Sequence, residues 1–206
     1  MSKSLNTLYA ALLFAATGSV FGASSVDLSV KGTITPSACT PALSSGGVYD
    51  IGKISAKDLK VETYTRLETH TMQFTVTCEA PTLIALQGND NRAGSEFRDE
   101  GNYGLGLING DEKLGSLSLK LESAVADGVA ARIIESQDGG ASWYEGGWLS
   151  REMIASVADN TTLAPLAVQS MSIDMILRPI IAATNTLTLT NEVLIDGSVS
   201  MTVFYL

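Results

Sequence analysis

Apolar and polar residues alternate along many short stretches of this chain. Residues 26–35, 72–78 and 198–203 carry apolar side chains or glycine at every second position. This period of two places successive side chains on opposite faces of a β-strand, one face buried and the other solvated. Glycine, asparagine and aspartate separate the stretches, as they do at turns between strands. The pattern predicts an all-β fold of many short strands, a sandwich or a barrel.

The last nine residues, SVSMTVFYL, form one such stretch and run to the final carboxylate. One face carries Val199, Met201, Val203 and Tyr205, and the other carries Ser198, Ser200 and Thr202. Phe204 is an aromatic residue on the otherwise polar face. Chain ends fray unless another element holds them, so a strand at this position needs a pairing partner.

Two dipeptides and one longer motif predict hairpin turns. Asn109-Gly110 and Asp127-Gly128 are residue pairs that favour tight turns between antiparallel strands. SQDGGASW, residues 136–143, fits the Asp-box pattern S-x-D-x-G-x-S/T-W. A sialidase-like propeller repeats this box once per blade, whereas it occurs once here, so it predicts a hairpin in which Asp138 bonds backbone amides. A helix is predicted over Ser150–Ala158, with Ser150 as its N-cap.

The first 22 residues predict a secretory signal peptide. A lysine precedes an apolar run over residues 8–17, and small residues follow it. A membrane anchor is the alternative, but the run is shorter than the roughly 20 apolar residues that span a bilayer. Residues 23–206 then form one domain, in which no further stretch predicts a membrane span. Export by this route indicates the periplasm or the cell surface of a Gram-negative bacterium.

Charge and cysteine content narrow the expected partners. The chain has 22 acidic and 13 basic residues, a net charge of −9 at pH 7. Nucleic acid is therefore not an expected partner, because phosphate binding needs clustered lysine and arginine.

Cys39 and Cys78 are the two cysteines, and an even number in an exported chain predicts a disulfide. Two cysteines and one histidine cannot form a zinc site of the usual closed kind.

Candidate catalytic and metal-binding residues are few. His70 is the single histidine, and no G-x-S-x-G nucleophile motif accompanies it. The segment GLGLING, residues 104–110, lacks the Lys-Ser/Thr of a P-loop. A polar stretch predicts a solvated loop, with calcium binding as the alternative; its carboxylates are Asp90, Glu96, Asp99 and Glu100. We expect no enzymatic activity, no catalytic residue, no cofactor and no metal.

Three stretches resemble one family of bacterial proteins. VKGTITPSACTP is similar to the opening strand and first cysteine of chaperone–usher fimbrial subunits, and FTVTC is similar to the strand that carries their second cysteine. DGSVSMTVFYL is similar to their C-terminal strand, with a tyrosine as the penultimate residue. The segments GTITPSACTPALSSGGVYDIGKI and TCEAPTLIAL resemble one branch more closely, the DUF1120 type. That branch includes a periplasmic protein encoded beside glutamate synthase genes.

The resemblance implies an immunoglobulin-like, pilin-type β-sandwich that is either complete or lacks its last strand. In such subunits a periplasmic chaperone, and later the N-terminal extension of a neighbouring subunit, fills the groove beside the C-terminal strand. A chaperone, an usher and neighbouring subunits are thus the expected partners. The expected partner-binding residues are Val199, Met201, Val203, Tyr205 and Leu206. The candidate residues of an N-terminal donor, or of the domain's own first strand, are Val26, Leu28, Val30 and Ile34.

Two departures from the pattern keep a second function open. Such subunits often carry glycine fourteen positions from the end, where this chain has Val193. The segment between the predicted cleavage site and Gly32 is also short for a donor extension. If the N-terminal segment cannot act as a donor, we expect one of two alternatives. The chain is either a terminal subunit or a soluble periplasmic binding or regulatory module linked to nitrogen and glutamate metabolism.

Overall fold

The structure, a computed structural model of the 206-residue chain, describes residues 26, 28–31, 38–98 and 101–206. Contacts divide the chain into two compact units, residues 1–34 and residues 35–206. The predicted signal peptide and Ile34 lie outside the described residues.

In the first unit, none of the described residues belongs to a helix or a strand. Val26, Leu28 and Val30 are 94%, 90% and 87% exposed. With Ile34 they are the candidate N-terminal donor or first strand, and the choice between these two roles stays a prediction. The first strand in the described part of the chain begins at Cys39.

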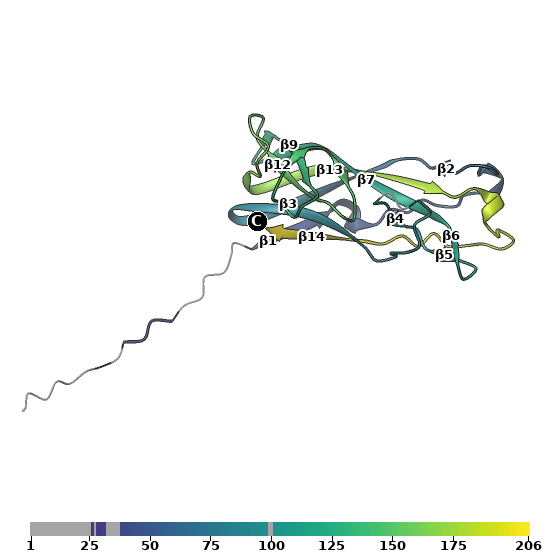
Figure 1. Cartoon of the computed structure of the whole chain (residues 1–206), viewed down its shortest axis with the longest axis horizontal. Coiled ribbons are helices and arrows are strands. Elements are labelled where there is room, and N and C mark those ends of the chain that lie inside the picture. The colour runs from purple at the N-terminus through teal and green to yellow at the C-terminus, as the bar shows by residue number, and fades with distance from the viewer. Residues whose placement is uncertain (1–25, 27, 32–37, 99–100) are drawn as a thin grey trace, which may run out of the picture. The chain divides into compact units, whose positions relative to one another are not determined.

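The second unit consists of strands and three short 3₁₀ helices (Figure 1). In chain order they are β1 (Cys39–Leu43), η1 (Ser44–Gly47), η2 (Ala56–Asp58), β2 (Thr65–Arg66), β3 (His70–Asp90), β4 (Tyr103–Gly104), β5 (Leu107–Ile108), β6 (Glu112–Lys113), β7 (Gly115–Ala126), β8 (Val129–Ala130), β9 (Arg132–Ser136), β10 (Tyr144–Glu145), β11 (Trp148–Leu149), β12 (Ile154–Ala158), β13 (Ala167–Ile181), η3 (Thr184–Thr186) and β14 (Val199–Tyr205). No helix in the described part of the chain is long and apolar enough to cross a membrane.

Two antiparallel sheets share the long strand β3 (Figure 1). In sheet A, the first part of β3 pairs with β1 and β13, and β13 pairs onward with β7 and β2. Strand β7 also carries β4, β8 and β11. In sheet B, the second part of β3 pairs with β14 and β12, followed by β9 and β10. The register between β3 and β13 shifts between Val168 and Ser170, where β3 passes from one sheet to the other.

The core lies between the inner faces of the two sheets. Every second residue of β3 and β13 points inward, as in Phe74, Val76, Met171 and Ile173, which are each 1% exposed. Fully burying such a side chain stabilises the fold by roughly 1.5–3 kcal/mol. A second, smaller apolar cluster consists of Leu105, Ile108, Leu114 and Ile181. The predicted all-β sandwich is confirmed.

Both predicted dipeptide turns are confirmed. Asp127 and Gly128 have φ angles of 47° and 81° and form the two-residue turn between β7 and β8. Asn109 and Gly110 have φ angles of 52° and 105° and lie in the turn between β5 and β6. Glycine and asparagine tolerate positive φ better than other residues do, so the sequence identifies these turns directly.

The predicted helix over Ser150–Ala158 is wrong, because Ile154–Ala158 forms strand β12. This strand pairs with β9 along its whole length and with β3 at Ala155. Ala155 and Val157 are buried in the main core, where they pack at the alternate spacing of a strand. Backbone pairing on two sides outweighs the weak helical pattern of this segment.

The Asp-box joins β9 to β10 and is confirmed as a self-stabilised hairpin turn. The amide of Ser142 donates to the Asp138 carboxylate at 2.9 Å, and the amide of Gly140 donates to Ser136 Oγ at 2.9 Å. The Ser142 hydroxyl also donates to Asp138. Trp143 closes the turn through a 3.0 Å bond from its indole nitrogen to the Gly140 carbonyl. The bonds from Ser142 and Ser136 lower the pKa of Asp138 to about 2.

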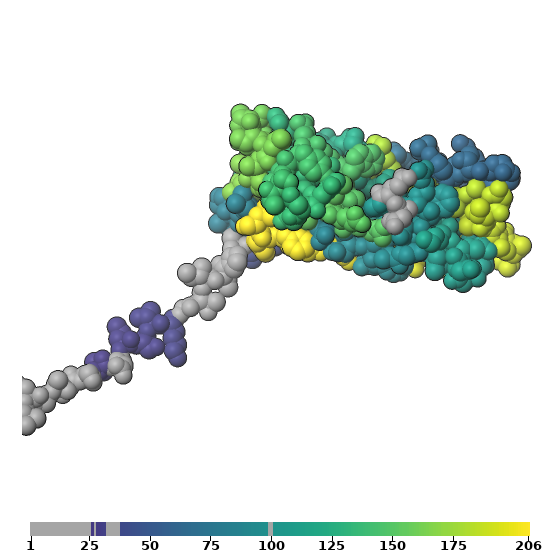
Figure 2. All heavy atoms as spheres, viewed as in Figure 1, coloured from purple at the N-terminus to yellow at the C-terminus, as the bar shows by residue number. Residues whose placement is uncertain are grey.

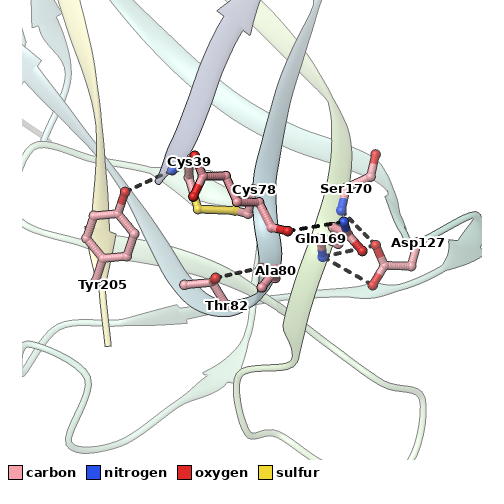
Figure 3. Close-up of a disulfide and its surroundings, with 9 residues drawn as sticks. Cys39, Cys78, Ala80, Thr82, Asp127, Gln169, Ser170 and Tyr205 are labelled. Carbon is pink, nitrogen blue, oxygen red and sulfur yellow. Dashed lines mark hydrogen bonds between the residues drawn. A yellow bond between two sulfur atoms is a disulfide. The ribbon is translucent and has the colours of Figure 1, made fainter. Parts of the chain in front are cut away.

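The predicted disulfide between Cys39 and Cys78 is confirmed (Figure 3). The two residues lie directly opposite each other in the ladder between β1 and β3, with their Cα atoms 4.0 Å apart. Cys78 is 3% exposed and belongs to the main core. The bond therefore ties the first residue of the edge strand β1 to the strand that both sheets share.

Replacing both cysteines with serine is expected to lower the free energy of unfolding by about 2–5 kcal/mol, because the cross-link restricts the unfolded chain. Urea denaturation of the oxidised wild type and of the double variant measures this difference. Thiol titration of the unfolded wild type is expected to find no free thiol; two free thiols would contradict the disulfide.

Asp138→Asn is expected to lower the melting temperature at pH 7, because the carboxylate accepts several bonds across the turn. A carboxyl whose folded-state pKa is lowered stabilises the fold above its ordinary pKa and loses that contribution as pH falls. The difference in melting temperature should therefore be full above about pH 4 and shrink toward pH 2. Asp111→Asn, at an exposed turn position, is the control. Equal melting temperatures of wild type and Asp138→Asn at pH 7 would show that the turn does not depend on this carboxylate.

Candidate functional site

The C-terminal strand β14 is an edge strand. It pairs antiparallel with β3 along its whole length, from Val199 opposite Asp90 to Tyr205 opposite Ile84. Within the described ranges it has no other strand partner. Its second edge therefore offers backbone donors and acceptors to an added strand. In the space-filling view the end of this strand, in yellow, reaches the surface (Figure 2).

The two faces of β14 differ in the way the sequence predicted. Val199, Met201 and Val203 pack against the main core and are partly buried. The opposite face bonds to two asparagines: Asn91, which directly follows β3, donates to Ser198 Oγ and Ser200 Oγ, and Asn89 of β3 donates to Thr202 Oγ1, at 2.9–3.0 Å. Phe204, on this second face, lies opposite Ala85 and is 41% exposed. The apolar face holds β14 on the sandwich, and the polar face fixes its register.

Strand β1 is the matching edge of sheet A and, like β14, pairs with β3 alone among the described strands. The two edges meet at one end, where the Tyr205 hydroxyl accepts a 3.0 Å bond from the amide of Cys39 (Figure 3). The penultimate tyrosine thus links the end of β14 to the start of β1, beside the disulfide.

An apolar groove of about 740 Å³ lies between these edges. Its walls are the segment that follows β1 and the segment that leads into β14, from Leu43 to Leu59 and from Leu189 to Met201. Its floor consists of apolar side chains from both core clusters, namely Met72, Leu119, Met175, Leu177, Leu105, Leu114 and Ile181. The groove is therefore an opening into the core of the sandwich.

Tyr49 fixes the first wall. Its ring stacks on the ring of His70, with centroids 4.5 Å apart and planes 4° from parallel. Its hydroxyl donates to the Glu68 carbonyl at 3.2 Å. Burial, and then the charge of Glu68, raise the pKa of Tyr49. The single histidine of the chain thus packs against the groove wall.

Two carboxylates fix the second wall. Glu112 accepts bonds of 2.7 Å from the amide and the hydroxyl of Thr188, and these bonds, with one from Asn109, lower its pKa. Asp196 accepts two 2.9 Å bonds from Arg92, in the side-by-side geometry that suits a guanidinium and a carboxylate. These contacts tie the segment before β14 to strand β6 and to the turn that follows β3.

One ion pair crosses the groove. Lys53 lies on the first wall and Glu192 on the second, with the Lys53 Nζ and Glu192 Oε1 atoms 3.9 Å apart. Their side chains are 92% and 78% exposed, so the pair contributes little stability and is screened by salt. A ligand that enters the groove can separate it at small cost.

The structure places two of the five predicted partner-binding residues, Val199 and Met201, in the lining of this groove. Val203 packs on the main core, and the Tyr205 hydroxyl bonds to the amide of Cys39. Leu206 is 47% exposed, and its amide donates to the Leu83 carbonyl at 3.1 Å. Sequence reasoning missed the first wall, because residues 47–59 have no strand-like alternation. Their scattered apolar residues, Ile51, Ile54 and Leu59, were the available signal.

The predicted solvated loop is wrong at Glu96, whereas Asn91, Ala93 and Gly94 of the same stretch are exposed. Glu96 is 6% exposed and accepts bonds from the Gly94 amide at 2.7 Å and from Arg151 at 3.4 Å. Asp90 accepts bonds from the amides of Arg92 and Gly104, both at 2.8 Å. These carboxylates hold the loop onto the sandwich. Asp99 and Glu100 lie outside the described residues.

Comparison with known protein families matches one part of this chain. The family model "Protein of unknown function (DUF1120)" matches residues 28–111. The predicted resemblance to the DUF1120 family is confirmed over these residues. The DUF1120 segment contains β1, the first groove wall and β3, whereas the second wall and β14 follow it.

Two Escherichia coli K12 proteins are similar to parts of this chain. The uncharacterized protein YhcF is 41% identical over 70 residues, which cover 34% of this chain and 29% of YhcF. Protein GltF is 36% identical over 99 residues, which cover 44% of this chain and 38% of GltF. The alignments thus span well under half the length of either relative.

Val203→Asp is expected to lower the yield of folded protein far more than Thr202→Asp. Placing an unpaired carboxylate against the core costs roughly 2 kcal/mol or more, whereas a carboxylate at position 202 can accept the bond from Asn89. The two variants add the same charge at neighbouring positions, so each controls for the other. Folded yield and urea midpoint are measured for both; equal losses would contradict the assignment of the two faces.

Proposed function

We propose that this chain is a fimbrial-like subunit that is exported to the periplasm and assembled by β-strand addition. The groove carries the proposal: two strand edges without a partner among the described strands border an opening that is floored by core side chains. An added strand would bond through its backbone to β1 and β14 and would fill the opening with alternate side chains. The role is structural, and we assign no catalytic step to the chain.

The proposed partners follow from the exposure of this groove. An apolar opening beside an unpaired edge promotes aggregation. A periplasmic chaperone would cover it first, and an usher would replace the chaperone strand with a segment of a neighbouring subunit. The resemblance of the C-terminal stretch to fimbrial subunits supports this order of partners.

The proposed donor is the N-terminal segment of another copy, residues 23–34. Val26, Leu28 and Val30 are exposed at alternate positions, as a donor strand requires, and Ile34 continues the pattern in the sequence. The nine residues between the predicted cleavage site and Gly32 extend over about 30 Å. This length exceeds the roughly 23 Å of the seven residues of β14. The segment is short beside the donor extensions of fimbrial subunits, but its length is sufficient to pair with the seven residues of β14.

A second candidate function is the binding of a small apolar molecule by a soluble periplasmic module, with a regulatory link to nitrogen and glutamate metabolism. A cavity of about 740 Å³ lies within the range of small-molecule sites, roughly 300–1,000 Å³. Under this alternative the protein must be stable with the groove free of any strand.

Periplasmic expression with and without a fimbrial chaperone distinguishes the two functions. The subunit proposal expects folded wild-type protein only with the chaperone, in a stable complex of the two chains. A folded monomer that accumulates without the chaperone would favour the small-molecule module.

A peptide of residues 23–34 tests the donor directly. Added to protein released from its chaperone, it should raise the melting temperature as its concentration increases, because it binds only the folded state. The same peptide with Leu28→Asp is the matched control and should have a much smaller effect. Equal effects of the two peptides, or none from either, would exclude this segment as the donor.

A further inference from the structure

The outer face of sheet A carries two aromatic rings that each contact two basic side chains. Arg66 and Arg98 lie 5.0 and 5.3 Å from the centroid of Tyr64. Arg178 and Lys120 lie 5.3 and 6.0 Å from the centroid of Trp148. We call these residues the arginine–aromatic face: Tyr64, Arg66, Arg98, Lys120, Trp148 and Arg178.

Strand register places both groups on the side of sheet A that faces away from the core. Lys120 pairs with Trp148 on one side and with Ile176 on the other. Ile180, four residues along β13, pairs with Arg66. Leu177 and Pro179, which alternate with these positions on β13, are buried, whereas Arg178 lies on the same face as Ile176 and Ile180. Four residues of a strand span about 13 Å, so the two groups lie at roughly that spacing along the sheet.

This face concentrates positive charge on an acidic chain. It holds four of the 13 basic residues of a molecule whose net charge is −9. Two acidic side chains border the Trp148 group: Glu122 bonds to Lys120 at 2.7 Å, and Asp174 lies opposite Glu122 in the strand register. Lys120, and to a lesser extent Arg178, lower the pKa of Glu122. Asp99 and Glu100, next to Arg98 in the sequence, lie outside the described residues.

Trp148 and Arg178 form the centre of the face. Arg178 Nε is buried and has no hydrogen-bond partner, because the guanidinium packs on the Trp148 ring. This packing restricts the side chain before any ligand binds, which lowers the entropy cost of binding. The indole is nevertheless 46% exposed. The pair thus offers an ordered cation beside an accessible aromatic surface.

We propose that the arginine–aromatic face binds an anionic polysaccharide. Planar guanidinium groups bind carboxylates through paired hydrogen bonds, and aromatic rings offer flat apolar surfaces to the apolar faces of sugar rings. Hydroxyl groups of Ser118 and Ser172, on the same face of β7 and β13, suit a ligand rich in hydroxyl groups. A flat face with two binding groups fits an extended polymer better than a small ion. None of the six residues lines the groove, so the site is independent of strand addition.

Binding of the folded full chain to immobilised polygalacturonate tests this site, with neutral dextran, polyglutamate and anionic lipid vesicles as comparison ligands. We expect binding to polygalacturonate that weakens with added salt, and at least tenfold weaker binding to the other three. Arg178→Gln and Trp148→Ala should each weaken it at least tenfold. Lys120→Gln, at a half-buried position of the sheet surface, should weaken it severalfold even if the other two variants fold poorly. Arg132→Gln is the matched control, because Arg132 pairs with Glu145 on sheet B.

Each remaining outcome overturns the proposal. Equal binding to polyglutamate or to vesicles would make the face a general anion-binding surface. An equal loss in Arg132→Gln would mean that binding is spread over the whole molecule. No binding of the wild type to polygalacturonate at low salt would show that the face does not bind this class of ligand.

Discussion

The fold depends on one strand that serves two sheets. The first part of β3 lies between β1 and β13, and its second part lies between β14 and β12. Strands β1 and β14 therefore depend on β3 for their pairing. Within the described ranges, neither strand pairs with a second strand. The disulfide and the Tyr205–Cys39 bond hold these two strands together at one end only. Away from that end they diverge, and the groove opens between them.

The polar contacts around the groove explain how its walls persist beside an opening into the core. Tyr49, which lines the groove, stacks on His70, and Asp196, beside the lining residue Ile195, pairs with Arg92; these contacts hold the two wall segments. The contact that crosses the opening, Lys53 with Glu192, is an exposed ion pair of little strength. The walls are thus fixed independently of whatever fills the space between them.

Local patterns predicted the strands and turns well because their causes are local. Alternation predicted β14 and much of β3, and positive φ at Asp127 and Gly128 explains why that dipeptide predicted a turn. The helix prediction failed at Ile154–Ala158 because pairing with β9 and β3 decides that segment. The burial of Glu96 depends on Arg151, 55 positions away, and no local pattern reports such a contact. The groove wall at residues 47–59 is irregular, so its position depends on tertiary contacts such as the Tyr49–His70 stack.

The two proposed binding surfaces use different parts of the sandwich, and this separation has a consequence for assembly. Strand addition would occupy the edges of β1 and β14, whereas the arginine–aromatic face lies on the outer side of β2, β13, β7 and β11. A subunit joined through its groove would keep that face free. A polymer of such subunits would then present one weak polysaccharide site per copy, at a regular spacing. Repeated sites on one assembly bind far more tightly than each alone when the ligand can reach several of them, so a face with modest affinity in the monomer is sufficient for adhesion by the polymer.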